Sequence, residues 1–233
     1  GAKLQEEADV IIRAGPLDNP ALLDRAKEGC RIRNSAQMTL EEVVEEIVAA
    51  EKEGKTTVRL HTGDPSIYGA IREQIDQLEA RGIPYDVTPG VSSFCGAAAA
   101  LGAEYTLPEV SQTVIISRMA GRTPVPAKES IPALASHGAT MVLFLSTGLL
   151  EGLQAQLMEG GYQADSPAAI VYKATWPDEK VFRCTVGTLA QTAAAHQITK
   201  TALILVGGFL GDTYERSKLY DPTFTTEFRK GVE

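Results

Sequence analysis

The chain has 233 residues, of which 22 are Lys or Arg and 30 are Asp or Glu, so its formal net charge is −8. Hydrophobic residues make up 44% of the sequence. This is an ordinary globular composition, with enough apolar side chains for a core in one large or two small domains. The acidic balance argues against a protein that coats nucleic acid or an anionic membrane surface. No apolar run approaches the roughly 18–20 residues that a membrane span needs.

The cysteines and histidines are few and widely separated. There are three of each, and neither set has the close spacing of a zinc site or of a disulfide framework. We therefore predict no metal site. Free cysteines are typical of a reducing compartment, so the sequence favours a cytoplasmic location.

The first half of the chain alternates helices and strands. Residues 1–9 are typical of the end of a helix that leads into an apolar strand at 10–12, and we expect further residues to precede Gly1 in the natural chain. Thr39 and Glu42 have the spacing of a capping box at the start of a helix with one apolar stripe. The elements expected after that helix are a strand at 57–60, a helix at 67–78, a strand at 85–88 and a helix at 91–101. This alternation predicts a parallel sheet with right-handed crossovers.

The second half begins near residue 110, where the stretch 105–111 has no clear periodicity. We therefore predict two domains, residues 1–110 and 111–233. The elements expected in the second domain are strands at 114–117, 141–145, 169–172, 181–185 and 203–206, and helices at 128–136, 149–159 and 187–196. The third and fourth of these strands are joined by a loop that contains a proline, which predicts a hairpin and hence a mixed sheet. The last 20 residues are polar and are expected to form a loosely held tail.

Two turns of the first half are candidates for a ligand site. Gly63 and Asp64 lie in a turn at 62–66, directly after a predicted strand. Residues 89–93 form a second turn of the same kind, directly after the next predicted strand. Because open α/β sheets bind ligands at the carboxyl ends of their strands, we expect the two turns to lie side by side. Free N–H groups at a helix N-terminus would favour an anion there, while Asp64 could bind an amine or hydroxyl groups. The alternative is that Asp64 or Ser66 only caps the following helix.

Two loops of the second half carry further candidates. Arg118 and Arg122 follow a predicted strand, and guanidinium groups bind carboxylates with two parallel hydrogen bonds. The alternative is a solvated loop without a ligand. Trp176, which is the only tryptophan, lies in the predicted hairpin loop. Its indole could flank a flat ligand or fill the edge of a core.

These segments together resemble a known family. Residues 62–69 (Thr-Gly-Asp-Pro-Ser-Ile-Tyr-Gly), followed by 87–94 (Val-Thr-Pro-Gly-Val-Ser-Ser-Phe), resemble the tetrapyrrole (corrin/porphyrin) methylases, which use S-adenosylmethionine. Segments 19–23, 118–126 and 171–180 are similar to the branch that methylates carbon 11 of precorrin-4 or cobalt-precorrin-4 in corrin (vitamin B12) biosynthesis. The likeness runs from about residue 1 to about residue 211. The family opens with a strand and a Gly-x-Gly-Pro-Gly-Asp loop, and this sequence begins after both.

The resemblance implies a fold, a cofactor and a set of contacts. It implies a two-domain α/β fold with a mainly parallel N-terminal sheet, helices on both its faces, and a mixed C-terminal sheet. It also implies a homodimer, with S-adenosylmethionine in the cleft between the domains. The residues that match cofactor-lining positions are Gly63, Asp64, Ile67, Ser92, Ser93, Leu145, Ala174, Thr201 and Ala202. A tetrapyrrole substrate carries carboxylates, for which Arg118 and Arg122 are the candidate partners, with Trp176 as a further substrate contact.

The implied chemistry needs little acid–base catalysis. Methyl transfer from a sulfonium to an electron-rich ring carbon depends on alignment, and orientation with desolvation can supply on the order of 7–11 kcal/mol. No catalytic residue is therefore assigned, and Asp64 is expected to orient the cofactor rather than to act as a base. Two alternatives remain open from the sequence. One is methylation of another tetrapyrrole position, and the other is a catalytically silent module of the same fold that binds a nucleotide-type ligand.

Overall fold

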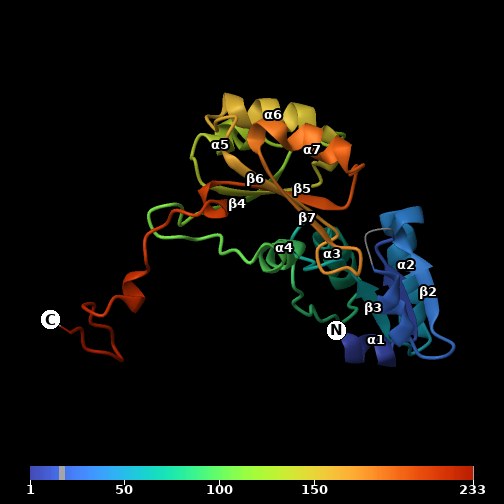
Figure 1. Ribbon diagram of the computed structural model, residues 1–233. Coiled ribbons are helices and arrows are strands. Elements are labelled where there is room, and N and C mark those ends of the chain that lie inside the picture. The colour runs from blue at the N-terminus through green and yellow to red at the C-terminus, as the bar shows by residue number, and fades with distance from the viewer. Residues whose placement is uncertain (16–18, 233) are drawn as a thin grey trace. The chain divides into compact units, whose positions relative to one another are not determined.

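The computed structural model describes residues 1–15 and 19–232 (Figure 1). The chain divides into two compact units, Gly1–Ser93 and the residues from Phe94 onward. The domain boundary expected near residue 110 stays a prediction. Within the described residues, no helix combines the length and the apolar content needed to cross a membrane.

The first unit is built on a sheet of three parallel strands in the order β2-β1-β3. Its central strand β1 (Val10–Arg13) is buried, and it packs with α2 (Leu40–Lys52), whose apolar stripe contains Val43 and Ile47. Both arms of the capping box form, since Thr39 N–H donates to the Glu42 carboxylate and Glu42 N–H to the Thr39 hydroxyl. The other elements are α1 (Ala2–Glu7), η1 (Pro20–Arg25), β2 (Arg31–Asn34), η2 (Ser35–Gln37), β3 (Thr57–Leu60) and α3 (Arg72–Glu79).

The first unit confirms the strands expected at 10–12 and 57–60 and their parallel pairing, but it corrects two elements. The strand expected at 85–88 is wrong, because in the described chain residues 83–92 have no regular structure and pair with no strand. The helix expected from residue 67 begins only at Arg72, because Tyr68 and Ala70 adopt left-handed backbone angles (φ 57° and 49°) that a helix cannot contain.

The second unit is built on a mixed five-stranded sheet in the order β4-β5-β8-β6-β7. β4 pairs parallel with β5, while β8 is antiparallel to both of its neighbours and β6 and β7 form the predicted hairpin. The strands are β4 (Val114–Arg118), β5 (Thr140–Phe144), β6 (Pro167–Tyr172), β7 (Lys180–Thr185) and β8 (Ala202–Val206). All five expected strands and the mixed sheet are therefore confirmed.

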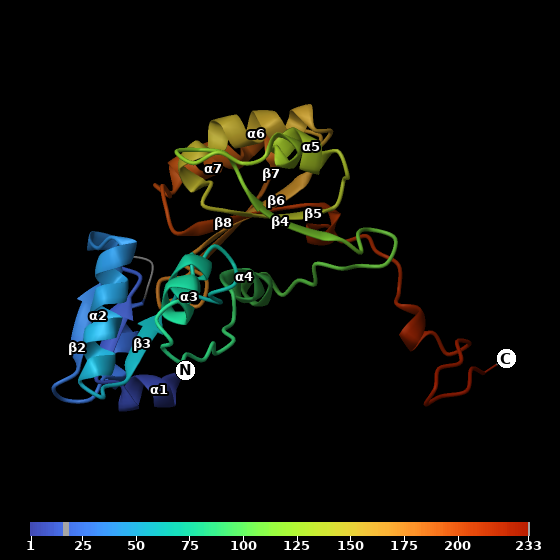
Figure 2. The same cartoon turned by 180° about the vertical axis from the view of Figure 1, so that it is seen from behind.

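Side chains of the second sheet alternate between two cores. Met141 and Leu143 of β5 belong to one cluster, whereas Val142 belongs to the other. The first cluster is covered by α5 (Ile131–Ala135), α6 (Leu150–Glu159) and α7 (Leu189–Ala195), which lie together on one face of the sheet (Figures 1 and 2). The second contains residues of α4 (Ser93–Leu101) and of η6 (Gly208–Leu210). Short 3-10 turns complete the unit: η3 (Ala127–Glu129), η4 (Thr147–Leu149), η5 (Val186–Thr188) and η7 (Lys218–Tyr220).

Candidate functional site

The two candidate turns of the first unit are in direct contact. Gly90 N–H donates to the Asp64 carboxylate at 2.8 Å, which links residues 26 positions apart. A Cβ on Gly90 would lie 2.0 Å from the Gly63 carbonyl oxygen, and a Cβ on Gly63 would lie 3.2 Å from the Ser92 Cα. The proximity that we expected is therefore present. It depends on two glycines that allow backbone to approach backbone.

Asp64 holds its own turn as well as the neighbouring one. Its carboxylate accepts hydrogen bonds from the Ser66 N–H at 2.9 Å and from the Ser66 hydroxyl. The Ser66 hydroxyl, then the N–H groups of Gly90 and Ser66, lower the pKa of Asp64 below its ordinary value. The carboxylate is therefore ionised at neutral pH and suited to accept hydrogen bonds rather than to supply a proton.

The turn at 62–66 differs from the sequence expectation in one respect. Because α3 begins at Arg72, this turn does not lie at the N-terminus of a helix. The anion site expected from helix N–H groups at this turn is therefore wrong, and so is the capping role considered for Asp64 and Ser66. The turn at 89–93, by contrast, does lead into a helix, since α4 begins at Ser93. Ser92 beside it is buried.

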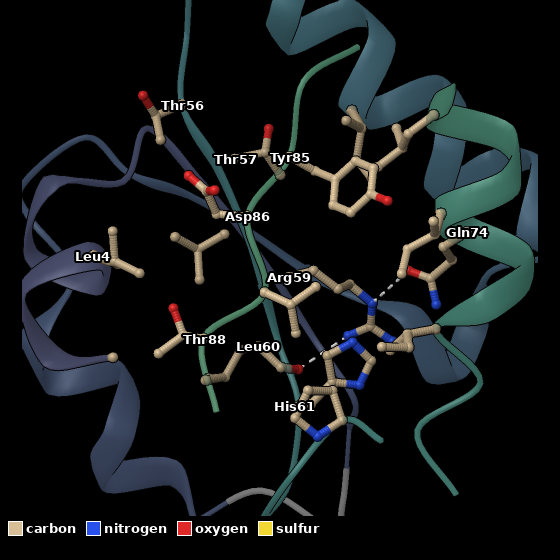
Figure 3. A pocket seen from close by; sticks show the side chains of 18 of the residues that line it. Leu4, Thr56, Thr57, Arg59, Leu60, His61, Gln74, Tyr85, Asp86 and Thr88 are labelled. Carbon is tan, nitrogen blue, oxygen red and sulfur yellow. Dashed lines mark hydrogen bonds between the residues drawn. The ribbon is translucent and has the colours of Figure 1, made fainter. Parts of the chain in front are cut away.

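A cavity of about 660 Å³ adjoins both turns and lies wholly within the first unit. It is lined by β3, by α3 and by the irregular segment 83–90, and Gly63 and Gly90 lie at its wall. Figure 3 shows the side chains of His61, Gln74 and Tyr85 around it, together with the Arg59 guanidinium.

Arg59 is a site residue that the sequence did not single out. It donates to the Gln74 amide oxygen at 3.2 Å (Figure 3), to the Ser35 hydroxyl at 2.9 Å, and to the carbonyl oxygens of Ile12 and Leu60 at 3.0 Å each. One guanidinium thus ties the carboxyl ends of β1 and β3 together, just before the turn at 62–66. The available signal was a lone arginine inside an otherwise uncharged strand.

The candidates in the second unit gather at one edge of its sheet. Leu145 follows β5, Ala174 follows β6, and Thr201 precedes the antiparallel β8, so all three lie at the same edge. Lys173 N–H donates to the Thr201 carbonyl at 2.9 Å, and the Thr147 hydroxyl donates to the Ala202 carbonyl at 3.1 Å. The topology thus brings together Leu145, Ala174, Thr201 and Ala202, which are the four cofactor-lining residues expected in the second unit.

The backbone at this edge is strained. Four of its non-glycine residues have left-handed φ angles between 48° and 72°, namely Leu145, Lys173, Thr175 and Thr201. Such conformations cost free energy and are concentrated at functional sites. Leu145 is also 62% exposed, which is high for a leucine at the end of a buried strand. Exposed apolar surface beside strained backbone is typical of a ligand-binding edge.

Arg118 and Arg122 differ in their surroundings. Arg118 ends β4, opposite Phe144 of β5, so the loop that follows it leaves the sheet at the same edge as Leu145. Its guanidinium donates to the carbonyl oxygens of Pro124 at 2.8 Å and Thr123 at 3.2 Å. Arg122 is exposed.

Trp176 lies at the other end of this row of strand ends, in the hairpin loop. The Lys173 ammonium is 5.0 Å from the centre of the Trp176 indole and 2.6 Å from the Asp178 carboxylate. The hydrogen bond to Asp178 favours the charged form of Lys173 and so raises its pKa. The charged ammonium makes a cation–π contact with the indole, which holds the ring in place. Its contact with a substrate stays a prediction, and in the described residues no group of His, Cys, Asp or Glu could hold a metal ion.

The chain is similar to known proteins over most of its length. The family model of the tetrapyrrole (corrin/porphyrin) methylases matches residues 1–190. The chain is 52% identical to a cobalt-precorrin-4 C(11)-methyltransferase of Methanocaldococcus jannaschii, over 99% of this chain and 89% of that protein. It is 45% identical to the protein of the same name from Priestia megaterium, over 100% and 92% of the two chains. A solved structure of a cobalt precorrin-4 methyltransferase matches with a TM-score of 0.88 and 43% identity, over 91% and 88%.

Proposed function

Because the chain belongs to the tetrapyrrole (corrin/porphyrin) methylases, we propose that it methylates carbon 11 of precorrin-4 or cobalt-precorrin-4, with S-adenosylmethionine as the methyl donor. The reaction is a step of corrin biosynthesis. Relatives that carry this activity in their names align with nearly the whole chain, which supports the carbon-11 assignment over another ring position. Cobalt, where present, belongs to the substrate.

The observation that carries the proposal is the contact between the turns at 62–66 and 89–93. By the family resemblance, the residues proposed to contact the cofactor are Gly63, Asp64, Ile67, Ser92, Ser93, Leu145, Ala174, Thr201 and Ala202. These residues fit a nucleoside. Exposed Leu145 offers apolar surface for a flat base, while the turns and strand ends offer backbone groups and a carboxylate for hydroxyl and amino groups.

S-adenosylmethionine, when bound, supplies an electrophilic methyl carbon on a positively charged sulfur. The residues of the chain would bind and orient the reactants. Asp64 already accepts three hydrogen bonds within the protein, and its oxygens retain lone pairs for a ligand hydroxyl. Orientation of this kind can lower a barrier by roughly 7–11 kcal/mol. No catalytic base is assigned.

Titration calorimetry with S-adenosylhomocysteine tests the cofactor site. We expect binding by the wild type and loss of most of the affinity in Asp64→Ala, which removes the link to Gly90. A wild type that does not bind S-adenosylhomocysteine would contradict the cofactor proposal. Mass spectrometry of the product, with the methylated carbon assigned by NMR, tests the reaction. Methylation at another carbon, or no methylation despite binding, would favour one of the two alternatives instead.

A homodimer in the cytoplasm completes the proposal. The three cysteines form no disulfide in the described structure, and free thiols suit a reducing compartment. The homodimer is carried over from the family resemblance. Light scattering coupled to gel filtration would measure it directly, and a monomeric mass at micromolar concentration would contradict it.

A further inference from the structure

The loop at residues 118–124, here called the arginine loop, is folded around the Arg118 side chain. Arg118 Nη2 donates to the Pro124 carbonyl at 2.8 Å, and Nη1 donates to the carbonyls of Thr123 at 3.2 Å and Met119 at 3.4 Å. One side chain therefore joins both ends of the loop. The planar guanidinium fork suits this task, since it directs several N–H donors at once.

The entrance of the arginine loop is also fixed to the sheet. Met119 N–H donates to the Ser146 hydroxyl at 2.9 Å, and that fully buried hydroxyl donates to the Phe144 carbonyl at 2.7 Å. The Met119 side chain packs against α6, where a Cβ on Gly152 would lie 3.0 Å from its terminal methyl carbon. The loop is thus anchored where β4 and β5 end.

Arg122 has a different environment from Arg118. It is exposed, and within the described part of the chain its side chain makes no hydrogen bond or ion pair. Charged residues of both signs are numerous in this chain and acids are in excess, with a net charge of −8. An arginine left without an acidic partner on an anchored loop is a suitable partner for an anionic ligand.

We infer that Arg118 is a positioning residue, which holds the arginine loop so that Arg122 meets a carboxylate of the tetrapyrrole. This inference rests on the proposed function. It assigns different roles to two arginines for which the sequence predicted the same role, that of carboxylate partner. Arg122 binds the substrate, and Arg118 acts through Arg122 by fixing the loop backbone.

A double-mutant cycle tests the coupling between the two arginines. The variants are Arg118→Gln, Arg122→Gln and the double variant, assayed with precorrin-4 generated in situ. Loss of a charged hydrogen-bond partner should raise KM roughly tenfold in Arg122→Gln. Arg118→Gln should raise KM by a similar or smaller factor, with kcat and the Kd of S-adenosylhomocysteine unchanged. The double variant should be no worse than Arg122→Gln alone. Effects that multiply would mean that Arg118 binds the substrate itself and would overturn the inference.

Limited trypsin digestion tests the loop without any substrate. Trypsin cleaves after Arg122, and release of the loop in Arg118→Gln should accelerate this cleavage severalfold. The matched control is Arg229→Gln, which removes an arginine that likewise donates to backbone carbonyls, those of Leu219, Asp221 and Phe224 in the C-terminal tail. This control should leave cleavage after Arg122 and KM unchanged. Unaltered cleavage in Arg118→Gln would overturn the inference even if the methyltransferase activity is confirmed.

A second substitution of Arg118 guards against a folding defect. Arg118→Lys keeps the charge, but one ammonium group cannot reproduce the planar fork that reaches the carbonyls of Met119, Thr123 and Pro124. It should therefore raise KM and accelerate cleavage, as Arg118→Gln does, in a protein whose unfolding transition matches that of the wild type. Full rescue by lysine would show that charge alone matters and would overturn the inference. Absence of S-adenosylhomocysteine binding by the wild type would instead contradict the proposed function.

Discussion

Gly90 occupies a position that accepts no side chain. A Cβ there would lie 2.0 Å from the Gly63 carbonyl oxygen and 3.3 Å from the Asp64 Cα, and both are backbone atoms that cannot rotate away. We expect Gly90→Ala to force the two turns apart. The variant should lose roughly 1–3 kcal/mol of unfolding free energy, as overpacked sites do. It should also bind S-adenosylhomocysteine at least tenfold more weakly.

Urea unfolding and calorimetry measure these two effects. Gly148→Ala is the matched control for stability, because the nearest atom to its added Cβ would be 3.9 Å away and its φ angle is not left-handed. The control should unfold at nearly the wild-type urea concentration. Equal behaviour of the two variants would mean that the contact between the turns contributes nothing.

The Asp64 carboxylate makes a prediction about pH. Hydrogen bonds from Ser66 and Gly90 lower its pKa from the ordinary value of 3.8. A group whose pKa is depressed by folding stabilises the protein above its unfolded-state pKa, and this contribution is lost as the pH falls through the folded-state pKa. The stability difference between the wild type and Asp64→Asn should therefore be constant from about pH 5 to 8 and shrink towards about pH 3. Urea midpoints across this range measure it, and a difference that grows in acid would show that the pKa is raised instead.

At the scale of elements, hydrophobic patterning predicted the helices and strands that pack against a core. It failed for segments whose structure depends on pairing with a neighbouring strand. Strand 10–12 and the helix with its capping box were evident, because their apolar residues face one cluster. β2 (Arg31–Asn34) was not predicted, since Ile32 is its only apolar residue and the strand lies at the edge of the sheet. The stretch 85–88 has strand-forming residues, but strand propensity without a pairing partner is insufficient.

Part of the candidate site was also predictable from the sequence. Glycine and aspartate after a strand mark a turn in any sequence, so the pair at 62–66 and 89–93 could be found and its contact expected. The left-handed φ angles of Leu145 and Thr201 could not, because neither residue favours that conformation and only tertiary contacts impose it. The bonds of Arg118 and Arg59 to backbone carbonyls were also hidden, since an acceptor on the main chain leaves no mark in the sequence.

At the scale of the whole molecule, charge opposes the proposed substrate. The chain carries a net charge of −8, while a tetrapyrrole of this class carries several carboxylates. The two therefore repel each other at long range, and attraction depends on local cations such as Arg122. Salt weakens both the repulsion and the attraction, because the electrostatic screening length falls from about 30 Å at 0.01 M to about 8 Å at 0.15 M ionic strength.

The long-range repulsion and the local attraction by Arg122 should therefore contribute with opposite signs to the salt dependence of kcat/KM. In Arg122→Gln the attraction by this arginine is lost and the long-range repulsion dominates, so raising NaCl from about 0.01 M to 0.15 M should increase kcat/KM on the order of two- to fivefold. In the wild type the gain should be smaller, because the same salt weakens the attraction between Arg122 and a carboxylate. Initial rates at several salt concentrations measure both, with the Kd of S-adenosylhomocysteine as the control, since that ligand has little net charge and should respond weakly. A wild-type gain as large as that of the variant would exclude Arg122 from contact with the carboxylates, and the positioning role of Arg118 would fall with it.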